Sequence, residues 1–137
     1  MKYKLPKTLV LDIKKWVCGA ESSNKKNKVG KGISKLQNSH GYMCCLGQFC
    51  KQANPDIDIS NYYSPSDIPI VITGLNRPRK KDDPINYLPN RYTKLSDKSM
   101  KINDNTHTLV TTKIKQLQQV LKSASYKLKI INKKYLP

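Results

Sequence analysis

Residues 108–131, TLVTTKIKQLQQVLKSASYKLKII, change their hydrophobic period partway along. In the first part, apolar residues recur at intervals of four, three and four, at Val110, Ile114, Leu117 and Leu121. This spacing is typical of one face of an amphipathic helix, which we expect over residues 108–124, with capping groups supplied by Asp104 to Thr106. In the second part, Leu128 and Ile130 alternate with lysines. That alternation predicts a strand, Tyr126–Ile131, whose lysines face solvent.

Two further segments provide partners for this helix and strand. Residues 8–13, TLVLDI, alternate large apolar side chains with smaller or polar ones, which favours a half-buried strand over Leu9–Ile13. Residues 42–53, YMCCLGQFCKQA, are dense in apolar groups and favour a short buried helix that Asn54 and Pro55 end. Gly47 weakens such a helix by about 1 kcal/mol relative to alanine, so we expect another element to pack closely over it.

We therefore expect residues 1–137 to form a single α+β domain. A small sheet containing Leu9–Ile13 and Tyr126–Ile131 is covered by the 108–124 helix, and the short cysteine-containing helix completes the core. Two regions fall outside this core: a flexible basic loop at 21–35, and a long proline-rich loop region at 55–101, in which only residues 68–73, IPIVIT, resemble a strand.

The chain is strongly basic. It has 26 lysines and arginines against nine acidic residues, a net charge of +17, and residues 105–137 carry seven lysines and no acid. A field of this sign attracts polyanions. Only Arg77, Arg79 and Arg91 are arginines, which argues against bidentate recognition of guanine. The abundance of lysine, asparagine and isoleucine also fits an AT-rich genome, so a purely compositional origin of the charge stays open.

The candidate contact residues are lysines of two regions. In the basic loop they are Lys25, Lys26, Lys28, Lys31 and Lys35. In the acid-free C-terminal region they are Lys115, Lys122, Lys127, Lys129, Lys133 and Lys134. If the two predicted strands pair, both sets are placed to meet on one side of the molecule.

The cysteines and histidines lack a catalytic or metal-binding pattern. The paired Cys-x2-Cys spacing of structural zinc does not occur among Cys18, Cys44, Cys45 and Cys50. We expect no metal, no cofactor, and buried reduced thiols. His40, four residues before Cys44, is expected in a turn, and His107 in solvent near the start of the last helix. The sequence shows neither a secretory signal nor a stretch of membrane-spanning length, so we expect neither secretion nor membrane insertion.

Residues 36–50, LQNSHGYMCCLGQFC, resemble the signature of small uncharacterised proteins of tailed phages and giant DNA viruses. Those proteins share a Leu-x-Asn-x-x-Gly-x-Met-Cys-Cys-Leu-Gly core and a strand followed by a basic-Trp pair, here Lys15-Trp16. Residues 64–67 and 102–104 are similar to their middle and pre-helix segments. The resemblance implies a viral origin, possible membership of an amoebal giant-virus group, and a compact α+β domain, but no activity.

From the charge and the resemblance together we expect a non-enzymatic viral protein that binds nucleic acid or another polyanion without sequence specificity. One alternative is a virion or host-interaction protein that contacts acidic protein surfaces, and a third is a small hydrolase or thiol enzyme. The expected location is the host cytoplasm or the virion. The oligomeric state and the choice between DNA and RNA stay open.

Overall fold

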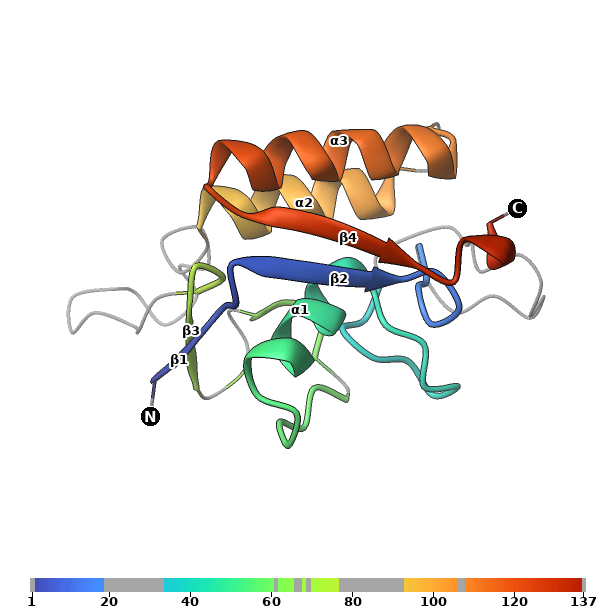
Figure 1. Ribbon diagram of the computed structural model, residues 1–137. Helices are drawn as coiled ribbons and strands as arrows, with labels where there is room; N and C mark the ends of the chain where they lie inside the picture. The colour runs from blue at the N-terminus through green and yellow to red at the C-terminus, as the bar shows by residue number, and fades with distance from the viewer. Residues whose placement is uncertain are drawn as a thin grey trace.

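The computed structural model describes residues 2–18, 34–60, 62–65, 68, 70–76, 93–105 and 108–136. Along the chain, the elements are β1 (Lys2–Lys4), β2 (Thr8–Asp12), α1 (Cys45–Ala53), β3 (Val71–Thr73), α2 (Lys94–Asp104), α3 (Val110–Ser123), β4 (Lys127–Ile131) and the 3-10 turn η3 (Lys133–Tyr135). The predicted α+β class is confirmed. Figure 1 shows α2 and α3 on one side of the β2–β4 pair and α1 on the other.

The two strands predicted from the sequence pair with each other. They run parallel, with Leu9 opposite Leu128 and Leu11 opposite Ile130. Leu9 and Leu11 of β2 are fully buried in the core, where α1, α2 and α3 meet the sheet. Strand β4 is less buried: its two lysines are exposed, and its other three residues are half-buried. A parallel pair requires a long crossover. Here that crossover contains α1, α2 and α3, so closing this sheet organises most of the chain.

The second edge of β2 is paired with side chains instead of a strand. The Gln48 amide accepts a hydrogen bond from Asp12 N at 2.7 Å and donates to Asp12 O at 3.1 Å. Gln52, one turn later in α1, makes the same pair of bonds with Val10 N and O, both at 2.7 Å. Because a side-chain amide carries a donor and an acceptor, each glutamine satisfies one residue of the strand edge.

Helix α1 is buried along its first six residues, Cys45 to Cys50. It begins later than predicted, because Cys44 is the N-cap and its sulfur accepts from Gly47 N at 3.4 Å. The expected close packing at Gly47 is confirmed: a Cβ atom there would lie 1.9 Å from the carbonyl oxygen of Leu36. All four cysteines are buried and free, as predicted.

Three features differ from the sequence-based expectation. Helix α2 occupies residues 94–101 of the region expected to be loop, and it begins with a capping box in which Thr93 and Ser96 bond each other's backbone N–H. Strand β1 was not predicted, and it pairs in parallel with β3, which lies in the expected 68–73 strand. Asp104 ends α2 and does not cap α3, whose N-cap, Leu109, makes no side-chain cap bond. Residues 21–33 of the basic loop and 77–92 lie outside the described residues.

We predict that Gly47→Ala destabilises the fold by at least about 3 kcal/mol, although alanine favours a helix by about 1 kcal/mol, because the Leu36 backbone must move. Gly41→Ala is the control. Its φ of +83° disfavours alanine, but the space around it is open, so the cost is about 1–2 kcal/mol. Urea unfolding of both variants measures the difference, and equal losses would contradict the contact.

Candidate functional site

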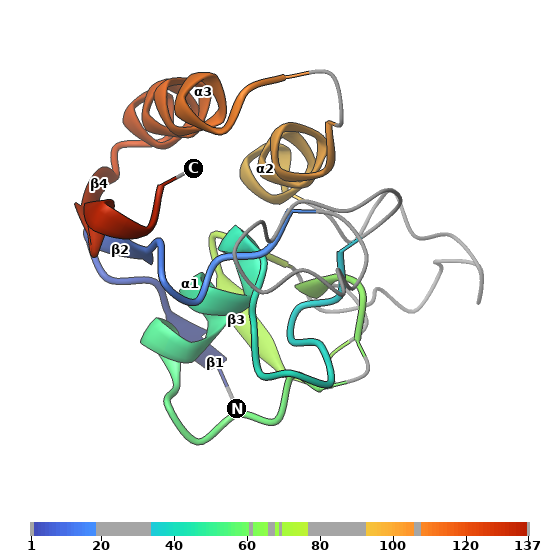
Figure 2. The same ribbon diagram turned by 90° about the vertical axis from the view of Figure 1, so that its right-hand side faces the viewer.

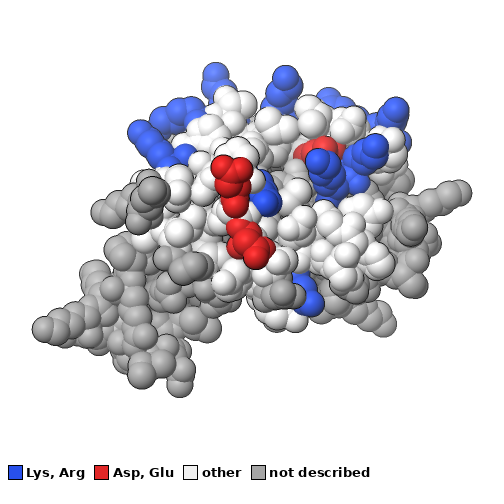
Figure 3. All heavy atoms as spheres, turned by 90° about the horizontal axis from the view of Figure 1, so that it is seen from below, with Lys and Arg blue, Asp and Glu red and all other residues white. Residues whose placement is uncertain are grey.

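The C-terminal lysines predicted from the sequence are all exposed. Lys127 and Lys129 occupy outward positions of β4, Lys133 and Lys134 lie in η3 directly after it, and Lys115 and Lys122 lie on α3. Figure 3 shows basic side chains projecting along one margin of the molecule, while much of the face seen there is uncharged. All six lysines are therefore exposed, and those of β4 and η3 lie on consecutive elements.

The carboxyl ends of β2 and β4 meet because the strands are parallel. There the Asp12 carboxylate accepts hydrogen bonds from Asn132 Nδ2 at 2.7 Å and from Lys14 N at 3.0 Å. Asn132 has a φ of +59°, a left-handed conformation that asparagine tolerates better than most residues. Asp12 thereby fixes the turn that leads into η3.

This turn brings Lys14 and Tyr135 together although 120 residues separate them. The Nζ atoms of Lys14 and Lys134 lie 5.7 and 5.3 Å from the centre of the Tyr135 ring, which is 42% exposed. Lys14 and Tyr135 are absent from the sequence-based set. Lys14 directly follows the first predicted strand and Tyr135 lies four residues after the end of the second, so a parallel pairing of those strands was the signal that could have found them.

The loop lysines are less completely placed. Lys25, Lys26, Lys28 and Lys31 lie outside the described residues, so the prediction that both sets meet on one side stays a prediction. Lys35 is half-buried, with its Nζ 5.9 Å from the centre of the Tyr63 ring, on a segment that lies away from β4 in Figure 2.

One C-terminal lysine is not part of the surface. Lys113 is 1% exposed and its Nζ donates to the backbone oxygen of Asn103 at 2.8 Å. That oxygen belongs to the last turn of α2, where a cation stabilises the carbonyl end of a helix. Lys113 therefore joins α3 to the end of α2.

The Asn103 side chain is the centre of a buried polar network. Its Oδ1 accepts from Trp16 Nε1 at 2.6 Å and from Cys45 N, the first amide of α1, at 3.1 Å. Its Nδ2 donates to Val17 O at 3.2 Å and lies 3.0 Å from Ser34 Oγ. The sequence indicated Asn103 only through the resemblance, because a polar residue does not contribute to a hydrophobic period.

Burial keeps the thiols protonated at neutral pH. It raises the pKa of Cys18 to about 12, an effect that the nearby Lys113 ammonium opposes, and it raises the pKa of Cys44 to about 12. The pKa values of Cys45 and Cys50 are raised by burial as well. A thiol is a poor nucleophile and metal ligand when it cannot ionise. Within the described part of the chain, no group of three or more histidine, cysteine or acidic side chains is placed to hold a metal.

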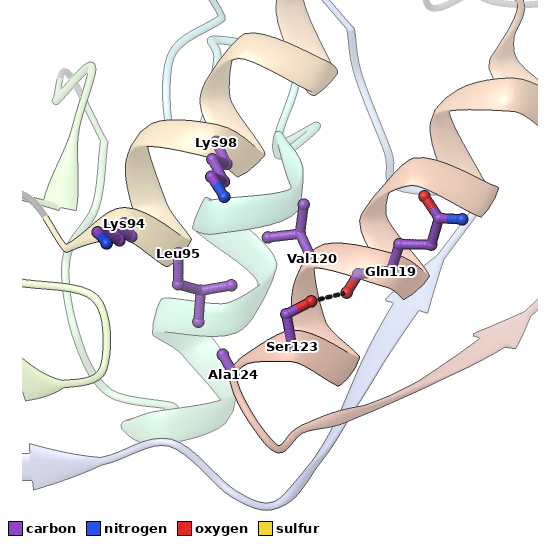
Figure 4. A pocket seen from close by; sticks show the side chains of 7 residues that line it. All are labelled: Lys94, Leu95, Lys98, Gln119, Val120, Ser123 and Ala124. Atoms are coloured by element: carbon purple, nitrogen blue, oxygen red, sulfur yellow. Dashed lines mark hydrogen bonds between the residues drawn. The ribbon is translucent and has the colours of Figure 1, made fainter.

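Two hollows lie beside candidate reactive side chains, Ser123 and His40. A hollow of about 230 Å³ lies between α2 and α3, where Lys94 and Lys98 flank a floor formed by Leu95, Val120 and Ala124 (Figure 4). The Ser123 hydroxyl at its edge already donates to Gln119 O at 3.0 Å. The described lining provides no histidine or carboxylate to act as a base, so the hollow lacks a nucleophile–base pair.

The second hollow, of about 490 Å³, is lined by the turn containing His40, together with Lys15 and Lys51. His40 lies in a turn, as predicted; it is exposed there, and its backbone N–H donates to Asn38 Oδ1 at 3.0 Å. The described lining contains no cysteine, and Cys44 is buried as the α1 N-cap, so His40 is not joined to a thiol. His107 lies outside the described residues. Among the helices that the structure describes, none has the length and apolarity needed to cross a membrane.

We predict that Asn103→Ala lowers the free energy of unfolding by about 2–5 kcal/mol, because two buried N–H donors, of Trp16 and Cys45, lose their acceptor. The exposed amide of Gln118, on the outer face of α3, provides the control, since Gln118→Ala should change stability by no more than about 0.5 kcal/mol. Urea unfolding followed by Trp16 fluorescence measures both, and a neutral Asn103→Ala would refute the network's importance.

We predict that stability falls above pH 9, the ordinary thiol pKa. Below it the thiols are protonated in both states; above it the unfolded chain loses thiol protons that the folded chain retains up to about pH 12, so unfolding is favoured. Each thiol should contribute about 1 kcal/mol of loss between pH 8 and 10. Chemical denaturation at several pH values across this range measures the free energy of unfolding. In Cys50→Val, which has one buried thiol fewer, this free energy should fall by about 1 kcal/mol less than in the wild type. A wild-type free energy of unfolding that does not fall between pH 8 and 10 would contradict the prediction.

Comparison with known proteins does not assign this chain to a family. No protein-family model, curated protein or solved structure matches this chain. The resemblance to phage and giant-virus proteins therefore stays a prediction that rests on residues 36–50 and the segments named with them. The function of this chain has to be inferred from its own side chains.

Proposed function

We propose that this protein binds nucleic acid without reading base sequence, through lysine–phosphate contacts along β4, η3 and the end of β2. The observation that carries the proposal is the gathering of exposed lysines on consecutive elements: Lys127, Lys129, Lys133 and Lys134, joined by Lys14. Among the described residues, Asp12 is the acidic side chain at this end of the strands, and Asn132 Nδ2 donates to its carboxylate. The lysine ammonium groups are thus available to an external anion.

The chemistry of these side chains favours phosphate over bases. A lysine ammonium is a point charge that contacts phosphate oxygens in any orientation, and such contacts position a strand without specifying its sequence. Each contact to duplex DNA contributes about −0.9 to the log-log slope of affinity against salt, so five contacts give a slope near −4.5. A role in a virus, in the host cytoplasm or the virion, is proposed with this activity on the resemblance alone.

A structural explanation exists for part of the same pattern. Within the described sheet, β4 is an edge strand, and lysines on an edge strand prevent pairing with other chains. That explanation covers Lys127 and Lys129. It does not cover Lys133, Lys134 or Lys14, which lie beyond the ends of the strands, and they support the binding proposal.

We predict that the triple variant Lys127→Gln, Lys129→Gln, Lys133→Gln flattens the salt slope for duplex DNA by about 2.7. The matched control removes the same charge from α2, which lies away from β4 in Figure 2: Lys94→Gln, Lys98→Gln, Lys101→Gln. It should change the slope by less than about one contact, or 0.9. Fluorescence anisotropy over a salt series measures the slopes, and thermal unfolding verifies that both variants fold.

Equal losses in the two triple variants would show that net charge alone governs binding and would remove the β4 surface as the site. An acidic polypeptide in place of DNA tests the other class of partner. Capture of that polypeptide at low salt by a protein that binds neither DNA nor RNA under the same conditions would replace nucleic acid by an acidic protein surface as the partner.

A further inference from the structure

The side chain of Tyr135 is exposed, and lysines surround it. The large hydrophobic side chains that the described residues expose are Tyr63, Leu109 and Tyr135. Of these, Tyr135 lies within the C-terminal lysine surface, and two ammonium groups, of Lys14 and Lys134, lie over its ring. An exposed aromatic ring next to paired cations is the combination by which single-stranded nucleic acids are held, with a base on the ring and phosphates on the cations.

We propose that the Tyr135 ring is a stacking platform for a base of single-stranded nucleic acid, with Lys14 and Lys134 contacting the phosphates on either side. The inference rests on the proposed function and narrows it to single strands in preference to duplex. Bases of a duplex are stacked on each other, so they reach an external ring only after unstacking, whereas the bases of a single strand are free to stack on it.

The backbone that carries the ring is held in place before any ligand arrives. Tyr135 N donates to Asn132 O at 3.1 Å, and Leu136 N donates to Lys133 O at 3.0 Å, which closes the η3 turn. The Asn132–Asp12 bond ties this turn to the end of β2, and Leu136 packs against the core beyond it. A preformed platform loses little conformational entropy when a base stacks, which favours binding.

The ammonium groups of Lys14 and Lys134 can leave the Tyr135 ring and contact phosphates instead. Both side chains are exposed, and a cation–π contact at an exposed site is weak. When a base stacks on the ring, an ammonium group that leaves the ring moves to a phosphate, where it gains a charge-assisted hydrogen bond. The same side chains therefore cover the ring in the free protein and hold the backbone in the complex.

The test compares a labelled single-stranded DNA of mixed sequence with a hairpin duplex of the same number of phosphates, by fluorescence anisotropy at low salt. Tyr135→Ala should weaken single-strand binding about 5- to 100-fold, the range of one base–aromatic stack, and change duplex binding less than about twofold. Tyr135→Phe keeps the ring and should retain single-strand binding within about twofold. Tyr63→Ala is the matched control, because Tyr63 is 50% exposed against 42% for Tyr135 and its ring lies near one ammonium group, that of Lys35; the substitution should change neither affinity.

A spectroscopic readout reports stacking directly. The chain's single tryptophan, Trp16, is buried, so Tyr135→Trp adds an exposed indole at the platform. Its added emission should be quenched by the single strand and much less by the duplex, since quenching requires contact with a base. The wild-type protein provides the Trp16 background.

Each result supports or overturns the inference. If wild-type protein binds both nucleic acids and Tyr135→Ala binds the single strand as tightly, the platform is refuted while the proposed function stands. Equal weakening of both ligands by Tyr135→Ala, or of the single strand by Tyr63→Ala and Tyr135→Ala alike, also overturns it. If the wild-type protein binds neither nucleic acid, the proposed function fails and the platform with it.

Discussion

The hydrogen bonds of one buried amide, that of Asn103, hold the fold together. Its oxygen accepts from the Trp16 ring after β2 and from the first N–H of α1, and its nitrogen donates to the backbone of Val17. These bonds dock α2 against elements that lie 58 to 87 residues away in sequence. They matter because three of the four fully buried residues of α2, Leu95, Ser96, Ser99 and Asn103, are polar, and its other core contacts, from Met100 and Ile102, are only half-buried. Where hydrophobic burial is small, satisfied polar groups determine the position of a helix.

The position of α2 determines where the basic surface is formed. Lys113 ties α3 to the last turn of α2 through the Asn103 carbonyl. The chain then reverses at Ser125, which has a φ of +68°, and enters β4 beside β2. The other edge of β2 is occupied by Gln48 and Gln52, so β4 is confined to one side of it. The exposed lysines of β4 and η3 are therefore placed by buried contacts in which they take no part.

The sequence predicted elements whose burial is hydrophobic and missed those held by polar or non-local contacts. Helix α3 and strand β4 show their apolar period directly, and Gly47 signalled the close approach of Leu36. Helix α2 was missed because serines and an asparagine fill its core positions, which gives no period to detect. Strand β1 has three residues and depends on its pairing with β3. At the candidate site, single residues of β4 were predictable, but the meeting of Lys14 with Tyr135 required the strand direction.

The lysines of the described chain serve several physical roles, and this bears on why the chain is basic. A compositional bias toward lysine explains their number but not their positions. Lys113 is buried where a helix end needs a cation, and Lys127 and Lys129 also protect an edge strand. Neither need applies to Lys14 and Lys134, which lie over an exposed ring at the shared end of two parallel strands. An external anion would use both the charge and the exposure of those two side chains, which is why the proposal of polyanion binding rests on them and not on the total charge of the chain.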